Sequence, residues 1–167
     1  MSFLNIADKR FVVFGLANKK SIACAVARTL VEEGAEVLHV VRSEERKKTA
    51  QKLFPGSDVF VCDVEDEANI ERVRDEIRSG LEERGEQAVI DGIVHSIAFA
   101  NYSKGVKPFH ETIKHDFLQA VDISCFSFIS IANHFKDLLA KGASVVTISI
   151  STTRMASENY GYMAPIK

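Results

Sequence analysis

The stretch that decides the fold is RFVVFGLANKKSIACAVARTLVEEG, Arg10 to Gly34. It begins with RFVVFG, a continuous run of β-branched and aromatic residues closed by a glycine, which is typical of a strand buried on both faces. The segment after Ser21 has the spacing of an amphipathic helix, for which Gly34 provides a C-terminal stop. The residues expected on the buried face of this helix are Ile22, Val26, Leu30 and Val31. The stretch therefore predicts a buried strand, a tight turn and a helix packed against the strand.

The same alternation of strand-like and helical segments continues along the chain. Further strands are expected at EVLHVV, at DVFVCDV, within AVIDGIVHSIAFA and at SVVTISI (Ser144 to Ile150). The helices between them are a charged one capped by Ser43, a polar one in DEANIERVRDEIRSGLEERG, and a long one over roughly Thr112 to Leu139. Strands separated by helices in this way predict right-handed parallel crossovers, with helices on both faces of one sheet.

We therefore expect an α/β fold with a doubly wound parallel sheet of the Rossmann type and strand order 3-2-1-4-5. No linker, low-complexity tract or repeat beyond the alternation itself divides the chain, so residues 1–167 are expected to form a single domain. A sheet of this type has a position for a sixth strand, and this sequence does not contain that strand.

Composition limits the possible partners and the compartment. The chain has 167 residues, 46% hydrophobic and 26% charged, with a formal net charge of -2. This charge gives no general attraction for nucleic acid or for an anionic membrane, so neither is expected as a partner. Three cysteines (Cys24, Cys62 and Cys125) lack metal-type or redox-type spacing, which indicates reduced structural thiols. The N-terminus has no secretory pattern and no apolar run is long enough to span a membrane, so a cytoplasmic protein is expected.

In a doubly wound sheet, ligands bind at the carboxyl ends of the strands, near the point where the strand order reverses. After the first strand, Gly15 permits close backbone approach and Ser21 places a hydroxyl at a helix N-terminus, as a pyrophosphate requires. A single glycine is also typical of a plain strand-to-helix turn. After the second strand, Arg42 and Ser43, with Arg46 one turn on, suit a 2′-phosphate and so favour NADPH over NADH. A solvated basic helix start is the alternative interpretation.

The third and fourth strands end in two further candidate segments. Asp63 could accept a hydrogen bond from an adenine amino group while Val64 packs on the ring, or it could be an ordinary turn or helix-capping acid. In HSIAFA, Ser96 and Ala98 are small enough to accommodate a nicotinamide and its ribose. His95 is expected to be a core histidine, and because the other histidines form no ligand-spaced cluster, no metal site is expected.

After the fifth strand come Tyr160 and Lys167, seven residues apart. On a helix they would share one face with a rise of about 10 Å, which a lysine side chain can largely close. A nearby ammonium favours the phenolate, and so helps the phenol to act as an acid or as a donor to an oxyanion. Tyr162, five residues before the lysine, would face the other side of the helix. The alternative is a helix that carries two ordinary aromatic residues.

Together these segments resemble the short-chain dehydrogenase/reductase superfamily, and more narrowly the enoyl-acyl-carrier-protein reductases of bacterial fatty-acid synthesis. Most of the superfamily carries Tyr-x3-Lys, which would need a tyrosine at Met163, whereas this branch uses Tyr-x6-Lys, as Tyr160 and Lys167 do. GLANKKSIACAVA is similar to the branch's G-x5-S-I-A turn, and CDV, HSIAFA, DISCFSF and YGYM also look like its blocks. The resemblance runs from the N-terminus to the last residue.

The resemblance implies reduction of a trans-2-enoyl thioester of acyl carrier protein by NADPH or NADH. Tyr160 would stabilise the enolate oxygen, and Lys167 would hold the nicotinamide ribose. Ala100 would face the thioester. The residues that the resemblance places along the pyrophosphate are Gly15, Ala17, Ser21 and Ile22, those at the adenine are Asp63 and Val64, and the one beside the nicotinamide ribose is Ile97. Family members are commonly homotetramers.

The sequence departs from the family pattern at three places. Ile150 stands where the family usually has a second tyrosine, and Pro165 lies in the helix expected to carry the catalytic pair. Family chains continue past the lysine with further strands and substrate-binding helices, so the dinucleotide-binding domain is expected to be incomplete at its C-terminus, and inactive alone. A 3-ketoacyl or other carbonyl reductase, and a dinucleotide-binding module without turnover, remain alternatives.

Overall fold

The computed structural model describes residues 4–150 and 161–167, and within them five parallel strands form one sheet. The strand order, β3-β2-β1-β4-β5, confirms the predicted topology. The strands are β1 (Arg10–Phe14), β2 (Glu36–Val41), β3 (Val59–Val61), β4 (Ile90–His95) and β5 (Leu139–Thr147). β2 and β4 flank β1, so the strand order reverses beside the first strand, as in other doubly wound sheets.

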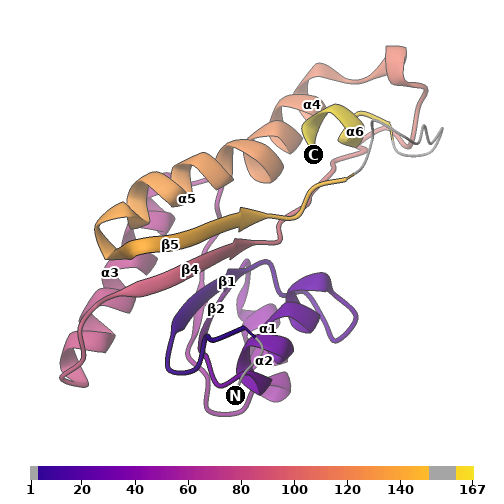
Figure 1. Cartoon of the computed structure of the whole chain (residues 1–167). Helices are drawn as coiled ribbons and strands as arrows, with labels where there is room; N and C mark the ends of the chain where they lie inside the picture. Colours follow the sequence, from indigo (N-terminus) through magenta and orange to yellow (C-terminus); the bar gives the residue numbers. More distant parts are fainter. Residues whose placement is uncertain (1–3, 151–160) are drawn as a thin grey trace.

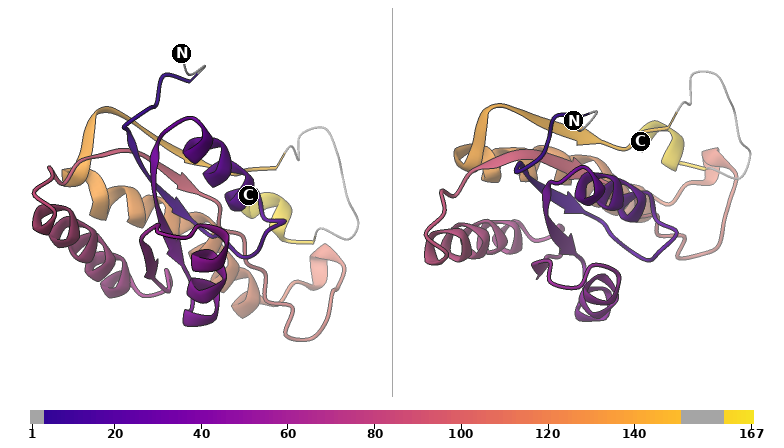
Figure 2. Two further views of the ribbon diagram at one scale, coloured as in Figure 1. Left: turned by 90° about the horizontal axis from the view of Figure 1, so that it is seen from below. Right: turned by 60° about the horizontal axis from the view of Figure 1, so that its bottom comes forward.

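Helices cover both faces of this sheet (Figures 1 and 2). The helices are α1 (Ile22–Glu32), α2 (Glu44–Leu53), α3 (Glu67–Glu83), α4 (Lys114–Val121), α5 (Ser127–Phe135) and the short α6 (Met163–Ile166). α1 and α2 pack on one face with Val13, Val37 and Val41, whereas α3 and α5 pack on the other with Val12 and Leu38. Alternate residues of β1 and β2 thus enter opposite cores, which explains their continuous apolar runs. No helix in the described ranges is both long and apolar enough to cross a membrane.

The buried face predicted for α1 was correct at Leu30 and Val26, which pack in the core, and wrong at Ile22 and Val31. Ile22 and Val31 are 56% and 45% exposed, whereas Ala23 and Ala27 are fully buried together with Cys24. The smaller side chains bring this helix close to the sheet, and the larger apolar residues at its start and end turn outward. The predicted stop was correct, since Gly34 has φ +86° at the end of the helix.

The single long helix predicted over Thr112 to Leu139 is also wrong in detail. The helical segment begins at Lys114 and is interrupted by one turn of π-helix, η2 (Asp122–Phe126), between α4 and α5. It closes with a 3₁₀ turn, η3 (Lys136–Leu138), and a separate 3₁₀ turn, η1 (Phe109–Glu111), precedes α4.

The strand predictions differ from the structure mainly at β5 and β3. β5 runs from Leu139 to Thr147 instead of from Ser144 to Ile150, because an irregularity in its pairing with β4, around Gly142 at φ +87°, extends the pairing back to Ile90. β3 occupies only Val59–Val61 of the predicted DVFVCDV.

The helix predicted to carry both Tyr160 and Lys167 starts later, at Met163. Gly161 has φ +53°, outside the right-handed helical region, so the helix does not extend back through it. Pro165 is the third residue of α6. A backbone N–H at this position has no acceptor within the helix, so the lack of an N–H in proline costs no helical hydrogen bond. α6 lies beside α4 (Figure 1), and Tyr162, Met163 and Ile166 are buried there against Ala120.

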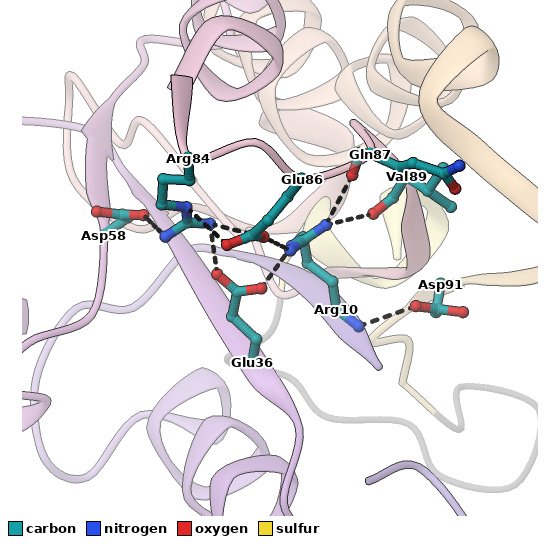
Figure 3. A network of polar contacts seen from close by, with 8 residues as sticks. All are labelled: Arg10, Glu36, Asp58, Arg84, Glu86, Gln87, Val89 and Asp91. Atoms are coloured by element: carbon teal, nitrogen blue, oxygen red, sulfur yellow. Dashed lines mark hydrogen bonds and ion pairs between the residues drawn. The ribbon is translucent and has the colours of Figure 1, made fainter. Parts of the chain in front are cut away.

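Charged residues join the amino ends of β1 and β2 to the segment after α3 (Figure 3). The Arg10 guanidinium contacts Glu36 and Glu86 and donates hydrogen bonds to the carbonyl oxygens of Gln87 and Val89, at 3.2 and 3.0 Å. Arg84 contacts the same two carboxylates and also Asp58, at 3.2 Å. The Arg10 side chain is only 13% exposed, so this network ties chain segments that are distant in sequence at a partly desolvated position.

We predict that Arg10→Met lowers the free energy of unfolding by about 1–3 kcal/mol, because it removes the donor to two carbonyl groups and leaves Arg84 as the remaining cation beside Glu36 and Glu86. Urea unfolding followed by circular dichroism measures this change. Arg78→Met is the matched control: among the described residues its one ion pair, with Asp75 at 3.6 Å, is exposed, so a loss within about 0.5 kcal/mol is expected. Equal losses in the two variants would contradict the prediction.

Candidate functional site

A cavity of about 270 Å³ lies at the carboxyl ends of β1 to β4. The predicted site residues that line it are Gly15, Ala17, Arg42, Asp63, Val64, Ser96, Ile97 and Ala98. They come from four separate segments, each placed just after a strand, so the parallel sheet alone brings them together. Arg46, expected near a 2′-phosphate, lines it as well, and so do residues not predicted in the site, among them Leu16, Cys62, Phe99 and Ile123.

Gly15 forms the base of the cavity at the closest approach of two segments. Its φ is +94°, and a Cβ atom added there would lie 2.3 Å from the Ser96 carbonyl oxygen. Its N–H donates to the Val40 carbonyl oxygen at 3.0 Å, and the Ser96 N–H donates to that of Phe14 at 3.1 Å. Glycine is therefore required by both the backbone conformation and the packing.

Two arginines border the cavity beside β2. The Arg42 guanidinium carbon lies 5.7 Å from the centre of the Phe99 ring, within range of a cation–π contact. Arg46, on the first turn of α2, donates to the Ala17 carbonyl oxygen at 2.7 Å and so fixes the loop after β1. In the described part of the chain neither arginine forms an ion pair.

Asp63 and Cys62 line the cavity at the end of β3. Asp63 accepts a hydrogen bond from the Glu65 N–H at 3.3 Å and therefore is the turn acid that one interpretation predicted, while Asp66 caps α3. Its carboxylate still borders the cavity, so both predicted roles are compatible. Burial raises the pKa of Cys62 to about 12, which keeps it a neutral thiol at physiological pH.

Besides Lys167, which is described below, four predicted site residues within the described ranges do not line the cavity. Ser21 and Ser43 cap α1 and α2 by accepting from the N–H groups of Cys24 and Arg46, at 3.3 and 3.4 Å. The Ile22 side chain is mainly exposed on the first turn of α1, and Ala100 packs beside Tyr162. Their roles toward a cofactor or a substrate stay predictions.

Lys167 reaches the candidate site from α6. Its ammonium donates to the Ile97 carbonyl oxygen at 2.8 Å, on the segment that lines the cavity after β4. The Ser149 hydroxyl, after β5, donates to the Lys167 carbonyl oxygen. Burial lowers the pKa of Lys167 from its ordinary value. The other member of the predicted pair, Tyr160, lies outside the described residues.

Tyr162 is held away from Lys167 in a small apolar cluster. Its hydroxyl donates to the Asn101 carbonyl oxygen, and its ring packs against those of Tyr102 and Phe117, at centroid distances of 5.1 and 6.0 Å. Burial raises the pKa of Tyr162, with smaller contributions from Tyr102 and Asp116. The ring is 3% exposed, so Tyr162 has a structural role.

His95 is the core histidine that its sequence context predicted. It is fully buried at the end of β4, with Nδ1 2.9 Å from the Thr147 hydroxyl and Nε2 2.8 Å from that of Ser127. Ser127 donates its own hydrogen to the Ile123 carbonyl oxygen at 2.6 Å, so it accepts from Nε2–H. We therefore assign the neutral Nε2–H tautomer, with Nδ1 accepting from Thr147.

The cavity residues absent from the predicted site carry little sequence signal for a binding role. Phe99 and Ile123 are ordinary apolar residues, and the π-helix that turns Ile123 toward the cavity has no recognised sequence pattern. Arg46, a cation one helical turn beyond Arg42, was expected near a 2′-phosphate, and it lines the cavity. No three His, Cys, Asp or Glu side chains within residues 4–150 and 161–167 gather as metal ligands would.

Comparison with known proteins places this site in a family context. The profile of the enoyl-(acyl carrier protein) reductase family matches residues 15–167. The chain is 35% identical to the enoyl-[acyl-carrier-protein] reductase [NADH] FabI of Enterococcus faecalis and to the [NADPH] FabI of Staphylococcus aureus. These alignments cover 97% and 98% of the chain, but 63% and 64% of the relatives, so the chain spans just under two thirds of their length.

Solved structures show the same relationship. The chain superposes on the enoyl-[acyl-carrier-protein] reductase (NADH) of Aquifex aeolicus with a TM-score of 0.88 at 25% identity. It superposes on the Bacillus cereus enoyl-acyl carrier protein reductase, solved with NADP+ and indole naphthyridinone, with a TM-score of 0.86 at 30% identity. Each superposition covers 97% of this chain and 63% of the other.

We predict that His95 stays neutral well below the pH at which an exposed histidine takes up a proton. Burial lowers the pKa of His95 to about 4, and the nearby Lys167 charge adds to this effect. Side-chain ¹⁵N NMR at pH 5.5 should show the neutral Nε2–H tautomer; a titration midpoint above pH 6 would overturn the assignment.

The same lowered pKa predicts acid sensitivity of the fold. Above pH 6.5 His95 is neutral in both the folded and the unfolded states, whereas between pH 6.5 and about 4 only the unfolded state binds the proton. Its contribution to stability is therefore lost as the pH falls through this interval, by up to about 3 kcal/mol. Urea unfolding at several pH values should show this decline.

Proposed function

The chain belongs to the enoyl-(acyl carrier protein) reductase family, and we propose that it reduces the double bond of a trans-2-enoyl thioester carried by acyl carrier protein, with NADPH or NADH as reductant. The observation that carries the proposal is the position of the Lys167 ammonium, 2.8 Å from the Ile97 carbonyl oxygen. The contact supports the proposal because Ile97 belongs to the segment after β4 that also contributes Ser96 and Ala98 to the cavity lining.

The residues around the cavity fit a dinucleotide. Arg42 and Arg46 at the end of β2 offer charge to a 2′-phosphate, and Gly15 brings the backbone of the first turn close to the ligand. Asp63 and Val64 would accept the adenine at the end of β3, while Ser96 to Ala98 would line the nicotinamide ribose. These positions follow the order in which the parts of a dinucleotide extend across a doubly wound sheet.

The reaction divides between the cofactor and the chain. When bound, the nicotinamide supplies the hydride that adds to the β-carbon of the enoyl thioester. The electron pair of the double bond moves to the thioester oxygen as an enolate, to which the Tyr160 hydroxyl donates a hydrogen bond. Lys167 would hold the ribose and would add positive charge near that oxygen. A proton taken from water at the α-carbon completes the reduction.

We further propose a cytoplasmic enzyme that assembles as a homo-oligomer, a tetramer as is common in the family. Residues 1–167 would form its dinucleotide-binding domain. Met163 stands where a Tyr-x3-Lys carbonyl reductase would carry its tyrosine, and α6 buries that residue against α4, so the enoyl substrate is the better supported one.

The first test of the proposed function replaces the two tyrosines separately. In the full-length protein, we predict that Tyr160→Phe lowers kcat for crotonyl thioester by about 100-fold or more, since it removes the donor to the enolate oxygen. Tyr162→Phe, which loses only the bond to Asn101, should retain a kcat near that of the unmodified protein. Oxidation of NADPH or NADH, followed at 340 nm, gives both values.

The outcome separates the possible functions. Unchanged turnover in Tyr160→Phe would overturn the assigned role. Activity on acetoacetyl but not on enoyl thioesters would identify a carbonyl reductase. Cofactor binding with no turnover on any acyl thioester would identify a binding module.

The second test concerns cofactor preference. Arg42→Ala should weaken NADPH binding about tenfold relative to NADH, because the guanidinium is the exposed cation nearest the expected 2′-phosphate. Calorimetric titration with each cofactor gives the ratio of dissociation constants. Lys52→Ala removes the same charge from the last turn of α2, at the other end of that helix, and should leave the ratio unchanged. An unaltered ratio in Arg42→Ala would contradict NADPH recognition by this residue.

A further inference from the structure

The π-helix η2 joins α4 and α5 directly beside the cavity. A single π turn inserted into a helix changes which side chains face inward, and such turns are frequent at functional sites. Here Ile123 lines the cavity and Ser124 is buried, whereas the next two residues, Cys125 and Phe126, are exposed. The irregular turn therefore presents its first residues to the segment that follows β4.

Ser124 makes two hydrogen bonds to one residue of that segment. Its hydroxyl accepts from the Phe99 N–H at 2.8 Å and donates to the Phe99 carbonyl oxygen at 3.0 Å. Phe99 lies four residues beyond the end of β4, where no strand partner is available to its backbone. The Ser124 side chain thus supplies both the acceptor and the donor that a neighbouring strand would otherwise provide.

Phe99 connects to both ends of the candidate site. Its ring lies under the Arg42 guanidinium, at the end expected to bind the 2′-phosphate. Two residues earlier on the same segment, the Ile97 carbonyl oxygen accepts from the Lys167 ammonium. Displacement of the Phe99 backbone would therefore alter the positions of both Arg42 and Lys167.

We propose that Ser124 is a positioning residue for the reductase reaction: by holding the Phe99 backbone, it sets Arg42 for the cofactor phosphate and Lys167 for the ribose. This proposal rests on the proposed function for its catalytic consequence. The holding of the segment itself depends only on the two hydrogen bonds and can be tested without cofactor.

The alternative is that Ser124 only stabilises its helix, and Ser130 provides the matched control. Both serines are 4% exposed and lie on the same continuous helical segment. Within residues 4–150 and 161–167, the one hydrogen-bond partner of the Ser130 hydroxyl is the His134 imidazole, at 3.3 Å, within α5. Serine-to-alanine replacement thus removes an equally buried hydroxyl in both cases, but only at Ser124 does it touch the segment after β4.

The first experiment measures hydrogen exchange of the Phe99 amide by NMR in the unmodified protein, Ser124→Ala and Ser130→Ala. We expect exchange at least tenfold faster in Ser124→Ala alone, because that amide loses its acceptor. Equal protection in all three proteins would overturn the proposal. Ser124→Thr, which retains a hydroxyl, should keep the protection and provides a second variant if the alanine variant folds poorly.

The second experiment uses the same variants in cofactor titrations and crotonyl thioester turnover. Ser124→Ala should lower both the NADPH-over-NADH affinity ratio and kcat by about tenfold, with Ser130→Ala unchanged. Faster exchange with an unaltered ratio and unaltered kcat would reduce Ser124 to a structural role and overturn the proposal. If the unmodified protein binds no dinucleotide, the proposed function fails, while the exchange result still decides whether Ser124 holds the segment.

Discussion

The contact on which the site depends is the close approach of the turn after β1 to the end of β4. At Gly15 there is room for backbone only, since a Cβ would lie 2.3 Å from the Ser96 carbonyl oxygen. The hydrogen bonds from Gly15 to Val40 and from Ser96 to Phe14 align the ends of β2, β1 and β4. Because the order of a doubly wound sheet reverses at this point, the segments after these strands diverge and leave a cavity between them.

The segment after β4 has left the sheet and cannot use a neighbouring strand to satisfy its backbone. Side chains take over this role: Ser124 binds both backbone groups of Phe99, and Lys167 binds the Ile97 carbonyl oxygen. Below them, His95 links β5 to the helix through Thr147 and Ser127. A buried polar network of this kind specifies one arrangement, since each partner that moved would leave a desolvated group unpaired.

The sheet order and about half of the residues that line the cavity could be predicted from the sequence, because apolar runs indicate burial on both faces and the ends of parallel strands must meet. What could not be predicted depends on fine backbone geometry. The side of α1 that packs inward is formed mainly by small residues such as Ala23, and large apolar residues such as Ile22 and Val31 lie outside it. The π-helix gave no sequence signal, and the helical face expected to join Tyr160 to Lys167 assumed a backbone that Gly161, at φ +53°, does not adopt.

The arginines at the amino ends of the strands differ in their partners from those at the carboxyl ends, and the difference bears on function. At the amino ends of the strands, Arg10 and Arg84 share carboxylate partners, so their charge is neutralised within the fold. At the carboxyl ends of the strands, Arg42 and Arg46 have no ion pair within residues 4–150 and 161–167. Acidic residues are nevertheless slightly in excess in the chain as a whole. Cations kept beside a cavity without a carboxylate partner create a local positive potential that attracts an anionic ligand. The net charge of -2 therefore does not describe the carboxyl ends of the strands, where these two arginines would favour the phosphate groups of the proposed cofactor.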